Sequence, residues 1–263
     1  MFAVRAPGDV NGEYGPCLLG PISADETARV RAAAVASALA TDRDTELVLT
    51  ESLGGNTEAE TLPLPSSHRD SHSQSAQLLE TPTTVQPLVS QQNPSVLVME
   101  RESSATFLSD LRASRAERMA EETDVLTVDG RGQTDTIASI LVPIAGGRHS
   151  ELAATAATAI AAANDAAVDF FHVVEDGSPA SRKHGRALLE SAAAAPAYDQ
   201  TETWLYEAGS AADAIVEQST YYDLTVMGAP TVGPLERVVF GSTATDVRAD
   251  TDAPIVVAHA QRS

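Results

Sequence analysis

The chain has 263 residues, 43% of them hydrophobic, which is enough to bury a core in one large domain or in two of ordinary size. Its 37 acidic residues outnumber its 17 basic ones, and the net charge of −20 excludes a basic, phosphate-neutralising surface and therefore a nucleic-acid partner. Lysine occurs only at Lys183, and an acidic chain that keeps arginine but almost no lysine favours a salt-rich cytoplasm over an ordinary acidic protein.

No segment of the sequence has the pattern of an export signal or a membrane span. Residues 1–15 lack a long apolar run, and the Ala-rich run at 152–163 is too short to cross a bilayer. The single cysteine, Cys17, excludes an intrachain disulfide, and we expect it to be a small buried strand residue. We therefore expect a cytoplasmic protein without membrane insertion.

The amino-terminal half alternates expected strands with expected helices after a polar lead-in at residues 1–15. Ser23 and Glu26 have capping-box spacing and predict a helix to about Leu39. Residues 53–75 are rich in proline, serine and histidine and predict a loop. The remaining expected elements are strands at 17–23, 46–51, 76–80, 95–100 and 124–129, and helices at 83–92 and 105–122.

The same alternation starts again after a linker at 131–135. Ser150 is expected to cap an Ala-rich helix that ends at 164–165, and Ser178 with Pro179 opens a helix to about Ala194. Ser210 and Asp213 have capping-box spacing for a helix to Tyr222. The expected strands are 140–147, 168–175, 203–208, 223–228 and 254–259.

The two halves align with each other when one is shifted by 128 residues: residues 95–114 fall on residues 223–242 without a gap, and Met99 meets Met227. We therefore predict an α/β fold of two tandem, doubly wound, parallel five-stranded Rossmann-like units with strand order 3-2-1-4-5, comprising residues 16–130 and 136–263. In such a sheet, ligands bind at the carboxyl ends of the first and fourth strands. In the second unit those strands end at Ala145 and Gly228, so their glycine-containing turns are expected to face each other.

One stretch of the second half has the pattern of an anion site. A strand ends in a glycine, and a loop then leads to a Gly-Ser pair before a helix, so backbone N–H groups can converge on an anion. Here the strand ends at Gly228 and the pair is Gly241-Ser242. The alternative is that these glycines serve a tight turn and close helix–sheet packing. Gly146-Gly147 has the same two interpretations, either backbone donors for an anion or simply a turn before a helix.

The segments ILVPIAGGRHSELA (140–153), DLTVMG (223–228) and LERVVFGS (235–242) resemble the universal stress protein family in type and order. The resemblance covers the second half and, more weakly, residues 16–130. It implies a regulatory protein, not an enzyme, and a site for ATP or AMP. It also implies pairing of two units, which a tandem chain can achieve as a pseudo-dimer within one molecule or as a homodimer.

The resemblance carries nucleotide-binding roles to particular positions of the second half. It places Ala145 and Gly146 after the first strand, Val173 on the second strand, Gly228 and Thr231 in the glycine loop, and Gly241, Ser242 and Thr243 at the phosphates. Two positions depart from the family pattern, because Ala145 replaces an aspartate and Thr231 replaces a glycine, which predicts weak binding. In the first half, Glu100, Ser103 and Ala113 occupy the three glycine positions, so that half is expected to be a structural partner.

Other chemistry-bearing residues have a structural as well as a functional interpretation. His68, Asp70 and His72 could hold a metal but lie in the Pro/Ser-rich segment, and Arg237 could pair with Glu236 or bind phosphate. His172 and Trp204 are expected to be packed strand residues, with base stacking as the alternative for Trp204.

Three functions follow from these patterns. The first is a stress-response regulator that binds adenine nucleotide. The second is a nucleotide-free module that docks on a protein such as a transporter. The third is a nucleotidyl-type enzyme on the same fold, for which no acid–base or metal constellation is visible.

Overall fold

The computed structural model describes residues 15–20, 26–50, 77–79, 85–100, 115–128, 136–194, 198–229 and 254–262. Contacts divide the chain into an amino-terminal unit, which runs to Gly130 and includes the residues from His259 on, and a carboxyl-terminal unit over Arg131–Ala258. Among the described residues, no helix is long and apolar enough to cross a membrane.

The amino-terminal unit contains five parallel strands in the order β3-β2-β1-β4-β5. Apolar side chains of β1, β2, β4 and β5 form its core with those of α2 and α3, and on the other face the Cys17 thiol donates to the Ala36 carbonyl of α1. The elements are β1 (Cys17–Leu19), α1 (Glu26–Asp42), β2 (Leu47–Thr50), β3 (Gln77–Leu79), α2 (Gln86–Gln92), β4 (Val96–Glu100), α3 (Arg115–Met119) and β5 (Asp124–Val128).

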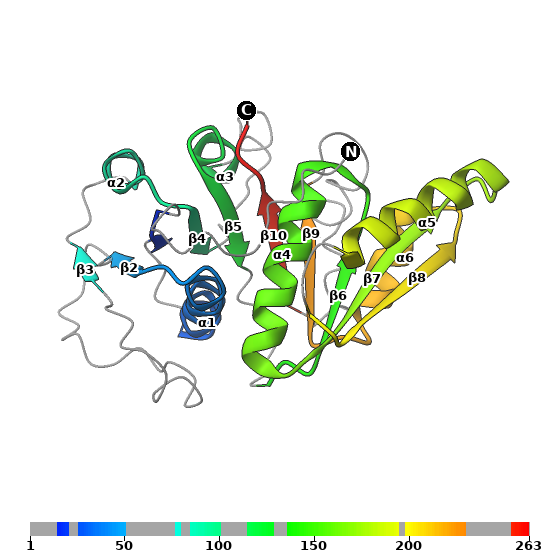
Figure 1. The fold of residues 1–263 in the computed structure, drawn as a ribbon, viewed down its shortest axis with the longest axis horizontal. Helices are drawn as coiled ribbons and strands as arrows, with labels where there is room; N and C mark the ends of the chain where they lie inside the picture. The colour runs from blue at the N-terminus through cyan, green and yellow to red at the C-terminus, as the bar shows by residue number, and fades with distance from the viewer. Residues whose placement is uncertain are drawn as a thin grey trace. The chain divides into compact units, whose positions relative to one another are not determined.

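The carboxyl-terminal unit repeats this order as β8-β7-β6-β9-β10, again with every pair parallel. Figure 1 shows α4 and α5 in front of the sheet of this unit and α6 behind it. The elements are β6 (Ser139–Pro143), α4 (Gly147–Asn164), β7 (Ala167–Val174), α5 (Pro179–Ala194), β8 (Thr201–Glu207), α6 (Ala211–Ser219), β9 (Leu224–Gly228) and β10 (Ile255–His259).

The predicted parallel α/β architecture is confirmed, and within each unit the strands have the predicted order 3-2-1-4-5. This order follows from right-handed crossovers, which place successive helices on one face until the direction of winding reverses. The central strands are apolar in nearly every position because helices cover both faces. The reversal lies between the first and fourth strands of each unit, where an open α/β sheet binds its ligands.

Two helix starts follow the predicted local chemistry. Pro179 is the first residue of α5, and the Ser178 hydroxyl accepts from the Ser181 N–H at 3.1 Å. Ser210 is the N-cap of α6 and accepts from the Asp213 N–H at 3.3 Å.

Two helix ends differ from the prediction. The helix α1 continues to Asp42, three residues beyond the expected end, since its last turns bury Leu39 and Ala40. The helix α6 ends at Ser219, not at Tyr222, because residues 220–223 form a turn into β9.

The prediction that Trp204 is packed under a helix is wrong, since its side chain is 41% exposed. It lies on β8, which pairs only with β7 in the described part of the chain. By contrast, its neighbour on the same strand face, Tyr206, packs on Phe171 with ring centroids 5.7 Å apart. Cys17 is fully buried as expected.

Candidate functional site

The carboxyl end of β6 turns sharply into α4 through two glycines. Gly146 has φ +90° and Gly147 has φ +76°, values that side chains with a Cβ rarely adopt. Gly146 is the N-cap of α4, so the expectation that Ser150 caps this helix is wrong. Ser150 lies in the first turn instead, and its hydroxyl accepts from the Ala145 N–H at 3.2 Å. The helix begins earlier than expected because two glycines can supply the positive φ of the turn.

The end of β9 lies directly against the start of α4. A Cβ on Gly228 would lie 2.7 Å from the carbonyl carbon of His149 and 2.9 Å from the Ser150 nitrogen, so only glycine permits this approach. Since β6 and β9 are neighbours in the sheet, the turn at Gly146 and the end of β9 occupy the same edge. This is the juxtaposition expected at the reversal point of the sheet.

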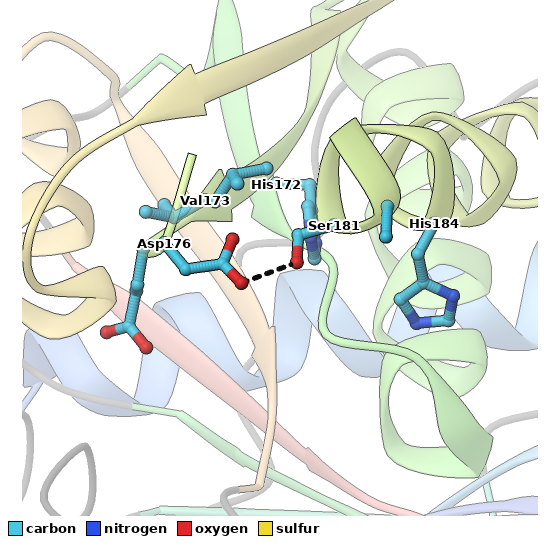
Figure 2. Close-up of a pocket in the computed structure, with 8 residues that line it drawn as sticks. His172, Val173, Asp176, Ser181 and His184 are labelled. Carbon is cyan, nitrogen blue, oxygen red and sulfur yellow. Dashed lines mark hydrogen bonds between the residues drawn. The ribbon is translucent and has the colours of Figure 1, made fainter. Parts of the chain in front are cut away.

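A cavity of about 510 Å³ opens at the carboxyl end of β7, beneath the start of α5. Its walls combine strand backbone with polar side chains from the first two turns of α5. The lining residues are His172, Val173, Val174, Glu175, Asp176, Ala180, Ser181 and His184. Figure 2 shows the Asp176 carboxylate pointing toward the Ser181 hydroxyl, which donates to it at 2.9 Å.

Asp176 is fixed by the turn that opens α5. Its carboxylate accepts from the Ser178 N–H at 3.0 Å as well as from the Ser181 hydroxyl. These bonds lower the pKa of Asp176, the Ser178 backbone bond contributing most, so the group stays ionised at neutral pH. A fixed negative charge repels an anion, so this cavity favours the uncharged part of a ligand.

His172 connects the cavity to the turn after β6. Its Nδ1 lies 2.6 Å from the carbonyl oxygen of Ile144. Because a carbonyl only accepts, Nδ1 carries the hydrogen, and Nε2 of the neutral ring is left as an acceptor. The ring is half-buried against α5 at Gly185, where a Cβ would lie 2.4 Å from Cδ2 of His172.

The prediction of a packed strand residue is therefore correct for His172 but incomplete, because the side chain also lines the cavity. The sequence does contain one signal of this close packing, which is Gly185 in the middle of the helix. A glycine in the middle of a helix costs about 1 kcal/mol relative to alanine, so its presence indicates a close approach of the helix to another element.

The structure brings together four of the predicted site residues at one edge of the sheet. Ala145 is exposed at the end of β6, Gly146 follows it, Val173 lines the cavity, and Gly228 lies against α4. The other predicted site residues lie outside the described residues, as do the suggested metal ligands and the arginine of the loop: Thr231, Gly241, Ser242, Thr243, His68, Asp70, His72 and Arg237. Within the described part of the chain, no group of three or more His, Cys, Asp or Glu could hold a metal ion.

Comparison with protein-family models finds a match in the carboxyl-terminal half of the chain. Residues 136–259 match the model of the Universal stress protein family. A comparison with curated protein sequences finds no match.

Two of the solved structures compared resemble the whole chain in fold, and a third covers about half of it. A universal stress protein from Archaeoglobus fulgidus is 16% identical and has a TM-score of 0.54, with 94% of this chain and 96% of that chain covered. The cytoplasmic domain of a prokaryotic cation chloride cotransporter is 11% identical, with the same TM-score of 0.54 and the same coverage of 94% and 96%. A universal stress protein in complex with cAMP is 22% identical over 47% of this chain and 97% of its own, with a TM-score of 0.36. The two likenesses that span the whole chain show that it shares an α/β fold with those two structures.

Proposed function

We propose that this chain is a regulatory protein of the universal stress type whose carboxyl-terminal unit binds an adenine nucleotide, ATP or AMP, weakly. The observation that carries the proposal is the convergence of the Gly146-Gly147 turn, Gly228 and the cavity beside Val173 at one edge of the sheet. The match of residues 136–259 to the family supports the same assignment.

The two parts of this edge suit the two parts of a nucleotide. The turn at Gly146 and the first turn of α4 present backbone N–H groups, which favour phosphate at the positive end of a helix dipole. The cavity repels anions through Asp176 and offers the Nε2 acceptor of His172, which suits the amino group of an adenine base. Ala145 supplies no polar side chain to the nucleoside, and this is why the proposed binding is weak.

The proposal extends to the whole chain. The amino-terminal unit repeats the strand order of the carboxyl-terminal unit, and we assign it the role of a structural partner in a tandem arrangement, a pseudo-dimer within one chain. The charge of −20 with a single lysine supports a cytoplasm of high salt concentration. The proposal assigns no catalytic step to the protein.

Titration of the whole protein with ATP and with AMP, at molar KCl and with or without Mg²⁺, tests the nucleotide site. Thermal stabilisation that grows with nucleotide concentration supports binding, with about 2.7 kcal/mol expected at one hundred times Kd. The variant Ala180→Glu places a carboxylate in the cavity and should abolish the stabilisation. The matched control Ala187→Glu, exposed on the same helix but not among the lining residues, should retain it. No stabilisation at millimolar nucleotide rejects the proposal.

The second candidate is a nucleotide-free interaction module, for example one that regulates a membrane transporter. Ala145 at the family's aspartate position favours it, since this exposed side chain cannot hydrogen-bond a nucleoside. The shared fold of a cotransporter's cytoplasmic domain is compatible with it. Absence of nucleotide binding together with capture of a defined partner by the whole chain would favour this candidate over the first.

A further inference from the structure

The α6 face of the carboxyl-terminal unit leaves the aromatic side chain of Trp204 uncovered. Trp204 on β8 is 41% exposed and Tyr221 in the turn after α6 is 73% exposed, and these are the exposed large hydrophobic side chains of the described residues. The helix α6 packs through Ala214 and Ile215 onto Phe171 of β7. Trp204 pairs in register with Phe171 but lies one strand farther out, toward the edge of the sheet.

Two carboxylates lie on the same sheet face as Trp204, one residue pair earlier on that face. Alternate strand residues share a face, so Glu202 lies beside Trp204 on β8, and Glu202 pairs in register with Asp169 of β7. The Asp169 carboxylate accepts the Tyr222 hydroxyl hydrogen at 2.5 Å. Burial raises the pKa of Tyr222 most, and the bond to Asp169 and the charges of Asp169 and Glu202 raise it further, as expected for a hydroxyl held among carboxylates.

We propose that this acidic-aromatic surface, formed by Asp169, Glu202, Trp204 and Tyr222, docks a basic segment of another protein that carries arginine side chains. A guanidinium stacks on an indole face and pairs with neighbouring carboxylates through its planar donors, and this surface offers both partners together. A second copy of the chain is a poor occupant, because the same surface of that copy presents carboxylates and no arginine to pair with them.

The inference goes beyond the nucleotide site and can fail independently of it. Trp204 shares a strand face with Tyr206, which packs on the α6 side of the sheet, whereas His172, Ser181 and His184 of the cavity lie on the α5 side. A ligand in the cavity does not occupy the acidic-aromatic surface.

Trp204 is the only tryptophan of the chain, so its fluorescence reports events at this surface alone. The experiment titrates the whole protein with an oligo-arginine peptide at moderate ionic strength, with oligo-lysine and oligo-glutamate peptides of equal length as comparisons. We expect the arginine peptide to change Trp204 emission and to bind more tightly than the lysine peptide. We expect no effect of the glutamate peptide.

Charge-matched variants separate docking at this surface from general attraction to an acidic protein. Calorimetry should show that Trp204→Ala and Glu202→Gln each weaken arginine-peptide binding about threefold to fivefold, the range of an exposed cation–π contact. Glu190→Gln removes the same charge from the exposed side of α5 and should leave the affinity within experimental error.

Three results overturn the inference: an unchanged emission, an equal loss of affinity in Glu202→Gln and Glu190→Gln, or wild-type affinity in Trp204→Ala. A concentration-dependent dimer seen by sedimentation, and lost in Trp204→Ala, would also overturn it and would assign the surface to self-association. All three variants alter exposed side chains, and circular dichroism will verify that they fold.

Discussion

The imidazole of His172 donates from Nδ1 to the carbonyl oxygen of Ile144, 28 residues earlier in the chain, across 2.6 Å. This bond joins the carboxyl ends of β7, which leads into the cavity, and β6, which leads into the Gly146-Gly147 turn. It fixes the orientation of a ring that lines the cavity.

The fit of His172 depends on Gly185. A Cβ at Gly185 would lie 2.4 Å from Cδ2 of His172 and 2.7 Å from Cδ1 of Leu205, so Gly185→Ala must displace α5 or the ring. We expect this variant to lose about 1–3 kcal/mol of unfolding free energy, the usual cost of overpacking. Urea denaturation of Gly185→Ala measures this loss. Gly209→Ala is the control, because a Cβ at Gly209 meets nothing within 4 Å. Equal stability of the two variants would refute the packing argument.

Asp223 links the start of β9 to the start of β6 through hydrogen bonds. Its Oδ2 accepts from the Ala138 N–H at 2.9 Å, the Ser139 N–H at 3.0 Å and the Ser139 hydroxyl at 3.1 Å. Asp223→Ala leaves these donors without their acceptor and should lower the unfolding free energy by about 1–2 kcal/mol. Asp223→Asn, which retains a carbonyl acceptor, should recover part of the loss, and Asp199→Ala at an exposed site should cost little. A neutral Asp223→Ala variant would contradict the assignment.

Cys17 gives the protein a pH dependence above neutrality. Burial raises the pKa of its thiol to about 12 from an ordinary value of 9.0, and the charge of Arg43 opposes this only in part. Below pH 9 the thiol is neutral in both folded and unfolded chains. Between pH 9 and 12 only the unfolded chain ionises, so the folded state loses stability as the pH rises. The wild type should therefore lose about 3 kcal/mol more than Cys17→Ala over this interval, at about 1.4 kcal/mol for each unit of the pKa difference. Parallel pH profiles of the two proteins would disprove this contribution.

The departures from the family pattern predict a gain of function. Ala145→Asp restores a polar partner for the nucleoside at an exposed position, and Thr231→Gly restores a glycine to the loop. Together they should strengthen ATP binding about tenfold, which is ~1.4 kcal/mol. Isothermal titration of the double variant against the wild type at molar KCl measures the change. An unchanged affinity would mean that the two positions are not what weakens the site.

Much of the fold was predictable because its determinants are local. Apolar runs bounded by turn residues marked the strands, and Ser178 and Ser210 marked their helices through hydroxyls that accept from the first turn. The start of α4 differs from the prediction because Ser150 has the chemistry of a cap, yet two glycines earlier in the chain supply the required positive φ.

The part of the candidate site that could be predicted is the part formed by glycine-containing turns. Gly146 and Gly228 were recognised since glycines after strands are visible in the sequence, but the cavity depends on how closely Gly185 lets α5 approach β7. The exposure of Trp204 also depends on how a helix lies over the sheet, which the sequence does not show. Alternation along β8 tells which side chains share a face, but it does not tell how far the nine residues of α6 reach across that face.

The parallel strand order that recurs in both units has an evolutionary consequence. Within the described residues it is held by backbone hydrogen bonds between the strands and by apolar side chains between the sheet and its helices. Glu100 can therefore end β4 where Gly228 ends β9 without loss of the architecture. A lineage can abandon ligand chemistry in one unit by drift alone and keep that unit as a scaffold, so likeness of fold persists long after likeness of site has been lost.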